Sequence, residues 1–231
     1  MAKMHGRHTR IYLDGFDIGG DFNSFEPGFA ADTVEVSGFG DDTKKYAVGL
    51  ADPQIRLAGV YNDATDQAHE VSSARIGSLV MMNGLWGTLV GQFGAGGSVN
   101  LNEYSVSSGI SAAVTTATSL SGGAGTAATG VFEFITTLLS KATIPTDPSG
   151  FQTNTQSNLG MSGHLQFFSG TGTVRIQSSP DDAAWTDRVD FGLQTAPIGV
   201  YGTSATGTVA TFLRTILVAG TGTAWTGFKR F

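Results

Sequence analysis

The chain has 231 residues, no cysteine and a formal net charge of −6, and only 14% of its residues are charged, well below the roughly 25% of an average soluble domain. The length suffices for one large or two small domains with a buried core. The lack of cysteine excludes disulfides and thiolate metal sites, and an acidic balance without a basic run argues against an electrostatic nucleic-acid binder. So neutral a surface suits a protein that uses it for self-assembly, with an ordinary glycine-rich β-sandwich as the alternative.

The amino-terminal part predicts short antiparallel strands. The first residues, MAKMHGRHTR, are basic with no apolar run behind them, so we expect no signal peptide. No stretch approaches the about 18 consecutive apolar residues of a membrane span. A strand begins at Arg10 and turns at Asp14 and Gly15, and residues 23–29, 32–37 and 54–61 follow as strands, the last two alternating apolar with polar side chains.

The segment between the last two of these strands is the most informative in the chain. We expect residues 38–53 to have no regular structure, and so long a connection is usually disordered or functional. Apolar side chains at Phe39, Tyr46, Val48 and Leu50 argue against disorder, because they favour burial. We therefore predict a protruding arm, a loop over residues 38–52, that is ordered by a neighbouring subunit.

The middle of the chain predicts one helix and further strands. The helix begins after Asn62 with Asp63 as its N-cap, places Ala68, Val71 and Ala74 on one face, and ends at Gly77. Strands are expected at residues 78–82, 86–93, 102–108, 110–118 and 131–135. Turns are expected at Asn83 and Gly84 and in the glycine cluster of residues 94–97.

The carboxy-terminal part predicts a separate small sandwich. Residues 146–159 are polar and contain proline, and form the expected linker between a domain of residues 1–145 and a domain of residues 160–231. In the second domain, apolar runs at residues 164–168, 173–178, 188–193, 209–218 and 223–228 are separated by turns. Such spacing without a helical pattern is typical of a small antiparallel β-sandwich.

One stretch of the sequence resembles a known family. A strand is followed by Ala-Asp-Thr-x-Glu-Val, Phe-Gly-Asp, a lysine pair, Tyr and Gly-Leu-x-Asp, which is similar to the tail tube (major tail) proteins of long-tailed, siphophage-type bacteriophages. The resemblance spans roughly residues 10–135 and rests on moderately specific positions: Asp21, Asn23, Ser24, Ala31, Asp32, Thr33, Phe39, Gly40, Asp41, Lys44, Tyr46, Gly49, Leu50 and Asp52. Ser37 and Gly38 depart from it, since two hydroxyl residues are expected there.

The resemblance implies an all-β fold with one short helix: a tail-tube-type antiparallel β-sandwich or barrel-forming domain followed by the C-terminal small β-sandwich. It implies a structural virion protein, assembled in the host cytoplasm, whose hexameric rings stack into the tail tube and conduct the genome. The implied partners are copies of the chain, the tape measure, tail terminator and distal tail proteins, and DNA that passes without specific binding. No membrane and no cofactor is implied.

Two groups of residues are assigned to this assembly. The arm between subunits is expected to consist of Phe39, Gly40, Asp41, Asp42, Lys44, Lys45, Tyr46 and Leu50. Its acidic and lysine pairs are either a solvated tip or salt bridges that set the register between subunits. Thr33, Glu35 and Gln54 are assigned to the wall of the lumen, which should be polar and preferably acidic so that DNA slides.

No pattern nominates an enzyme. Neither His5, His8, His69 nor His164 lies in a catalytic motif, and GMSGH at residues 160–164 has a histidine where a nucleophile elbow needs glycine. The glycine clusters lack the end of a phosphate-binding loop, and the acidic pairs lack the spacing of a calcium loop. The alternative function is a virion decoration or carbohydrate-binding adhesion protein, in which Trp185 and Trp225 of the C-terminal domain contact glycans, although a tryptophan there more often fills the core.

Overall fold

The structure, a computed structural model, describes residues 8–37, 42–110, 113–122, 132–153, 155–204 and 207–231. Within these ranges the chain forms thirteen strands and one short helix, and all ladders between the named strands are antiparallel. The expected all-β class with a single short helix is therefore confirmed. Among these residues, no helix has both the length and the apolar character that a membrane crossing requires.

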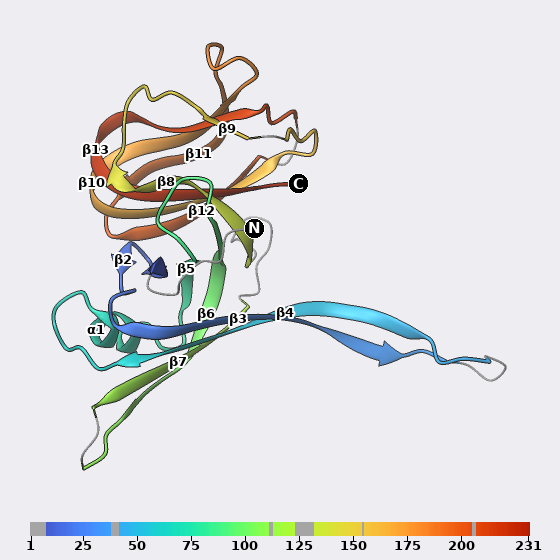
Figure 1. Cartoon of the computed structure of the whole chain (residues 1–231), viewed down its shortest axis with the longest axis vertical. Coiled ribbons are helices and arrows are strands. Elements are labelled where there is room, and N and C mark those ends of the chain that lie inside the picture. The colour runs from blue at the N-terminus through green and yellow to red at the C-terminus, as the bar shows by residue number, and fades with distance from the viewer. Residues whose placement is uncertain (1–7, 38–41, 111–112, 123–131, 154, 205–206) are drawn as a thin grey trace.

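The first part of the chain folds into a strongly bent sheet around one core (Figure 1). Its elements are β1 (Arg10–Leu13), β2 (Phe16–Asp17), β3 (Phe22–Glu35), β4 (Tyr46–Val60), α1 (Ala68–Ser73), β5 (Leu79–Leu85), β6 (Phe93–Ser107) and β7 (Thr115–Gly122). Four strands pair in the order β3-β4-β7-β6, and the other half of β6 continues to β5, β1 and β2. The core between these halves contains Ile11, Leu13, Ile18, Ile55, Leu57, Val80, Met82, Val99, Leu101 and Leu120.

The second part is built on two long, bent strands. Its elements are β8 (Glu133–Thr143), β9 (Phe151–Gln152), β10 (Met161–Ser179), β11 (Thr186–Thr195), β12 (Ile198–Ser204) and β13 (Phe212–Arg230). Strands β10 and β13 pair along nearly their whole length and bend at bulges, while β11 and β12 pair with successive halves of β10. This wraps a second core of Leu165, Phe167, Val174, Ile176, Val189, Leu213 and Leu217.

Strand β8 connects the two parts through hydrogen bonds, because it pairs with β6 on one side and with β13 on the other. The segment of residues 146–159 contains β9, which also pairs with β13. Arg214 in β13 forms a salt bridge to Asp147 at 2.5 Å. The division into domains at residues 145 and 160 stays a prediction, and the two parts lie one above the other in Figure 1.

A buried polar cluster lies where the two parts meet. The Glu133 carboxylate accepts hydrogen bonds from Ser162 and is paired with His164 Nε2 at 3.0 Å and Lys229 Nζ at 2.9 Å. His164 and Ser162 are fully buried, and His164 Nδ1 contacts the amide of Asn83 at 3.3 Å. Burial alone would raise the pKa of Glu133, but the bonds from His164, Ser162 and Lys229 hold it below its usual value.

Two expected turns are wrong for one steric reason. Asn83 and Gly84 lie inside β5, and the glycine cluster lies inside β6, paired with β5. A Cβ on Gly84 would stand 2.1 Å from the Phe25 ring, and one on Gly96 would stand 1.9 Å from the Asn83 amide. The glycines here leave room for side chains over the sheet, a use of glycine in strands that turn statistics do not capture.

Other expectations need correction as well. Residues 86–92 form a loop rather than a strand, and β4 already begins at Tyr46. The helix is shorter than expected, and its first residue is preceded by Gln67, without a side-chain cap. The carboxylate of Asp21 instead accepts a bond from the Ala68 amide at 2.9 Å, so the helix start is capped from 47 residues away.

Candidate assembly surfaces

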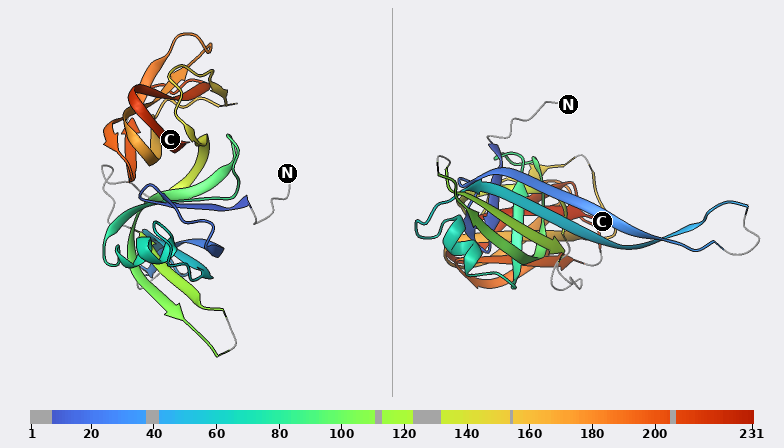
Figure 2. Two further views of the ribbon diagram at one scale, coloured as in Figure 1. Left: turned by 90° about the vertical axis from the view of Figure 1, so that its left-hand side faces the viewer. Right: turned by 90° about the horizontal axis from the view of Figure 1, so that it is seen from below.

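The arm is a two-stranded hairpin that leaves the body of the molecule (Figures 1 and 2). Strands β3 and β4 stay paired beyond the body, with Val34 opposite Ala47 and Glu35 opposite Tyr46. The Val36 amide donates to the Lys45 carbonyl at 2.9 Å. The predicted protruding segment therefore exists, but regular pairing of residues 22–35 with residues 46–59 extends it, and its length comes from strands rather than from an irregular loop.

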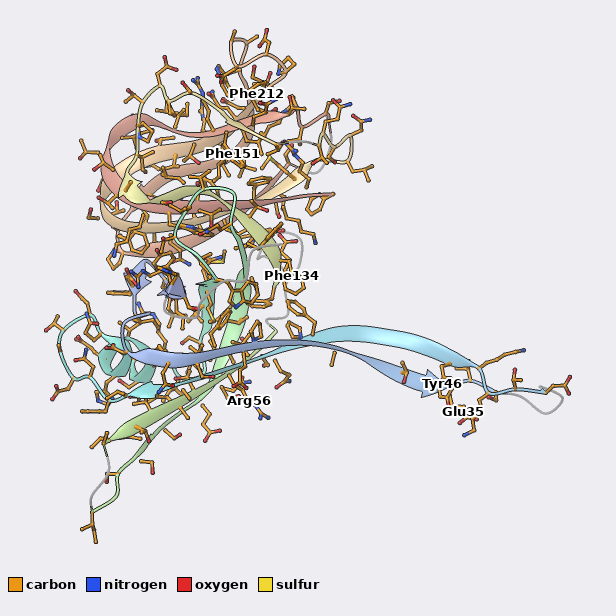
Figure 3. All side chains as sticks on the ribbon, in the orientation of Figure 1. Glu35, Tyr46, Arg56, Phe134, Phe151 and Phe212 are labelled. Atoms are coloured by element: carbon orange, nitrogen blue, oxygen red, sulfur yellow. The ribbon has the colours of Figure 1, made fainter. Side chains whose placement is uncertain are left out.

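Among the described residues, apolar side chains on the hairpin are largely exposed. Val34, Val36 and Tyr46 are 61%, 56% and 56% exposed, and Tyr46 and Glu35 lie together on the outer part of the arm in Figure 3. Lys44 forms an exposed salt bridge to Glu35 at 2.9 Å, which contributes little in an isolated chain. The hairpin offers both apolar and charged contacts to a partner.

Of the residues assigned to the arm, Asp42, Lys44, Lys45 and Tyr46 are exposed near its end. Leu50 belongs to β4. Phe39, Gly40 and Asp41 lie outside the described residues. A contact of this arm with another subunit stays a prediction.

Two strand edges of the β3-β4-β7-β6 sheet are open. Within the described residues, β3 pairs with β4 alone. A groove of about 700 Å³ runs beside its first residues, lined by residues 22–26, residues 9–11 and Trp86. At the opposite margin, β6 pairs with β5 only as far as Asn100, so in the described chain residues 102–107 have β7 as their one ladder partner. Open edges of this kind template pairing with another chain.

The outer face of this sheet is polar and lined by small side chains. Gln54, Arg56 and Ala58 point away from the core in β4, alternating with buried Ile55 and Leu57. Their partners across the sheet include Glu26 in β3 and Ser119 in β7, and Glu103 in β6 pairs with Ser119. Arg56 lies on the underside of the sheet in Figure 3.

The three residues assigned to the lumen do not share one face. Gln54 pairs with Gly28 and so lies on the outer face. Thr33 and Glu35 are an odd number of residues from Gly28 along β3, so their side chains point to the opposite face of the strand. The β-bulge between Ala31 and Thr33 inserts its extra residue into β4, so it leaves the alternation of β3 unchanged. By alternation, these two side chains lie on the face of β3 that carries Phe29.

An aromatic row runs beside the open edge of β3. Ring centroids are 5.7 Å apart between Phe25 and Trp86, 6.3 Å between Trp86 and Phe134, and 4.6 Å between Phe134 and Phe29. Phe132 closes the row against Phe29 at 5.4 Å. Phe134 also lines a groove of about 500 Å³ with Phe93 and Phe151, and Phe134 and Phe151 are labelled in Figure 3. Sequence alternation hid this row, since its members come from β3, from β8 and the residue before it, and from the loop between β5 and β6.

The two tryptophans assigned to glycan contact differ. Trp225 is fully buried in a small cluster with Tyr12, Leu85 and Ile135, so the expectation that it contacts a glycan is wrong. The side chain of Trp225 points from β13 toward the junction of the two parts, where Tyr12 and Leu85 lie. Trp185 is partly exposed and carries the Arg214 guanidinium over its ring at 4.1 Å. Glycan contact by Trp185 stays a prediction.

The titratable groups gather into no metal site. Within the described residues, no group of three or more His, Cys, Asp or Glu side chains could hold a metal ion. His164 belongs to the buried cluster at the junction, and His69 Nδ1 contacts the Tyr104 hydroxyl at 3.0 Å. Burial raises the pKa of Tyr104. Both histidines have structural surroundings.

Comparison with solved structures finds tail proteins of phages and of a gene transfer agent. The chain is similar to a chain of the virion of a native gene transfer agent particle, with 18% identity, a TM-score of 0.45 and coverage of 57% of this chain and 99% of that one. It is similar to the SPP1 tail tube protein, with 10% identity, a TM-score of 0.42 and coverage of 57% and 77%. The SPP1 Dit protein, described as a hub of the adsorption apparatus, matches at 8% identity, a TM-score of 0.36 and coverage of 96% and 99%.

No family model matches the sequence, and no curated protein matches it. With identities of 18% or less and TM-scores of 0.45 or less, the structural likenesses leave the family of this chain open.

Proposed function

We propose that the protein is the repeating subunit of a phage tail tube, in which copies close laterally into rings and the rings stack into a hollow cylinder. One observation carries the proposal: within the described residues, the β3-β4-β7-β6 sheet has an open strand edge at each margin. Pairing these edges between copies satisfies backbone groups that otherwise face solvent. The sequence resemblance to tail tube proteins supports the same function and implies hexameric rings.

The direction of the strands supports lateral closure. All pairings in the sheet are antiparallel, so β3 and β7 run one way while β4 and β6 run the other. When β6 of one copy meets β3 of the next, the new pair is antiparallel too, and the pattern continues around a ring without interruption. Pro27 lies within β3, and a proline is tolerated in an edge strand.

The outer face of this sheet would then line the lumen. It carries Glu26, Arg56 and Glu103 among serine, threonine and alanine side chains, so each copy contributes more acidic than basic groups. Such a wall repels the DNA phosphates weakly and gives them no cationic cluster to bind. Genomic DNA would pass without being held, and the second part of the chain would lie on the outside of the tube.

Stacking would use the hairpin arm. A contact between the arm and a different surface of the next ring is heterologous, and such a contact propagates without closing. The tape measure, tail terminator and distal tail proteins would meet the tube at its ends, and the protein would reside in the virion. The protein performs assembly rather than turnover.

Deletion of residues 41–46 tests the arm. We expect the fold to survive, since residues 42–46 are exposed and lie beyond the two cores, with a free energy of unfolding within about 0.5 kcal/mol of the parent, while long tubes disappear from negative-stain images. Leu193→Ser, at a side chain that is 70% exposed in β11, serves as a control and should leave tubes intact. Tubes of normal length from the deletion variant would contradict the role of the arm.

The same images separate the alternative function. A virion decoration or carbohydrate-binding protein would give discrete small oligomers or monomers with no tubes, and would bind glycans through Trp185. Stacked rings from the parent protein favour the tube.

A further inference from the structure

We propose that the exposed end of the aromatic row, Phe29 and Phe134, together with the adjoining Phe93, anchors the contact between neighbouring subunits of a ring, and that a second copy covers these three rings with Ile76 and Leu79. This inference rests on the proposed ring. The seam is the lateral contact between two neighbouring copies in the ring. Side chains have to specify it, because backbone pairing alone would leave the choice of partner and the register of the strands weakly determined.

The first flank of the seam is an exposed aromatic surface. Phe29, Phe93 and Phe134 are 41%, 67% and 57% exposed, and Phe29 and Phe134 stack at 4.6 Å. Because Phe29 belongs to β3, this surface is continuous with the open edge. Contiguous apolar surface of this kind marks interaction sites, and aromatic side chains at the centre of an interface carry much of its binding energy.

The second flank lies beside the other open edge. Ile76 and Leu79 are 50% and 48% exposed. They are fixed next to β6, because the Gly77 amide donates to the Leu101 carbonyl at 2.8 Å and the Leu101 amide donates to the Ser78 carbonyl at 3.1 Å. The open part of β6 begins immediately after Leu101. Each open edge therefore has apolar side chains next to it, aromatic on one side and aliphatic on the other.

The two flanks are complementary in their apolar character. When β6 of one copy pairs with β3 of the next, the aliphatic side chains beside β6 face the aromatic side chains beside β3. Both apolar surfaces then leave solvent, which favours the contact.

Because the chain has no cysteine, engineered cysteines report this contact directly. Chains with Phe93→Cys and Ile76→Cys together are assembled, treated with a short bismaleimide and separated under denaturing conditions. We expect a ladder that ends at the ring size, a hexamer on the family resemblance. A mixture of the two single variants should give dimers and nothing larger, and each single variant alone should give monomers.

Phe93→Cys combined with Leu193→Cys is the matched control, since Leu193 is 70% exposed, more than Ile76 at 50%, but lies in β11, away from both flanks. Phe134→Ser provides a second readout and should raise the protein concentration needed for assembly about tenfold or more.

Three outcomes would count against the inference. If rings are seen by microscopy but Phe93→Cys cross-links no better to Ile76→Cys than to Leu193→Cys, this inference alone is overturned. A ladder that continues past the ring size would place the contact between rings instead and overturn it as well. A parent protein that forms neither rings nor tubes would overturn the proposed function, and this inference with it.

Discussion

Glu133 joins the two parts of the chain through a buried polar cluster. Its carboxylate is 6% exposed and binds Ser162, His164 and Lys229, which come from β10 and β13. A buried carboxylate is tolerated only when it is paired and hydrogen-bonded. The cluster therefore links β8, at the end of the first part, to the long strands of the second part.

Replacement of Glu133 by alanine should cost about 3 kcal/mol of unfolding free energy, the lower end of the range for a broken buried pair, because Lys229 is 43% exposed. Chemical denaturation measures this. Glu35→Ala, which breaks the exposed pair with Lys44, should cost less than about 1 kcal/mol. Equal losses in the two variants would contradict the role of the buried cluster.

The same residue predicts a pH dependence. The pKa of Glu133 is lower in the folded chain than its usual value. The ionised carboxylate therefore stabilises the fold at pH values above the pKa of the same group in the unfolded chain, which is about 4.3. That stability is lost as the pH falls through the lowered pKa. The difference in unfolding free energy between the parent and Glu133→Gln should be largest at neutral pH and shrink below about pH 4. A constant difference down to acid pH would show that the carboxylate does not titrate with folding.

Single residues could be predicted from the sequence only where their neighbours in the chain decide their role. The exposed tip residues Asp42 and Lys44 follow from local pattern. Trp225 and the cap at Asp21 do not, since each depends on a contact with a distant segment: Tyr12 for the first and the Ala68 amide for the second. Propensity and spacing carry no information about such pairs.

At the scale of elements, strand lengths were the main error. Apolar runs marked most strands correctly, with residues 86–92 as an exception, but breaks such as residues 169–172 were interpreted as turns. In the structure β10 passes through this break as one strand of 19 residues, and Gly170 and Gly172 pair closely with β13 there. Bulged, bent strands keep their pairing where local signals indicate a turn.

Gly84 tests this view of glycine in strands. A Cβ at this position would meet the Phe25 ring at 2.1 Å, so Gly84→Ala must displace Phe25 and with it Trp86. We expect a loss of about 1–3 kcal/mol, as for other overpacked cores, and a change in the tryptophan near-ultraviolet circular dichroism. Gly20→Ala, where no atom lies within 4 Å of the new Cβ, is the control. If Gly84→Ala were as stable as Gly20→Ala, close packing would not explain this glycine.

At the scale of the whole molecule, the features that matter are those that a single chain leaves unsatisfied. In the part of the chain that the structure describes, the sheet is open at β3 and at β6. Residues 33–37 and 42–47 of the arm are exposed, and aromatic rings remain partly in solvent beside one edge. The sequence predicted the arm from the length and the apolar side chains of the connection, and the self-assembling surface from composition. It did not identify β3 and β6 as the strands at the open edges, since the order β3-β4-β7-β6 depends on the pairing of β4 with β7, which are distant in sequence.

The outer face of this sheet gives the last prediction. If it lines the lumen, Glu103→Lys should reverse the local charge beside Arg56 on the inside of every ring. The side chain points away from the core, so tubes should still form, and they should now retain DNA that sediments with them and resists nuclease. Retention should weaken steeply as salt is raised, because phosphate contacts release counterions.

Asp63→Lys is the matched control, since it makes the same change of charge at an exposed position outside this face. DNA bound by this variant would lie on the exterior or at subunit contacts and would be open to nuclease. Nuclease-resistant DNA in the Glu103→Lys tubes but not in the Asp63→Lys tubes places the polar face inside. Equal protection in both, or none in either, would mean that a different surface of the subunit faces the DNA.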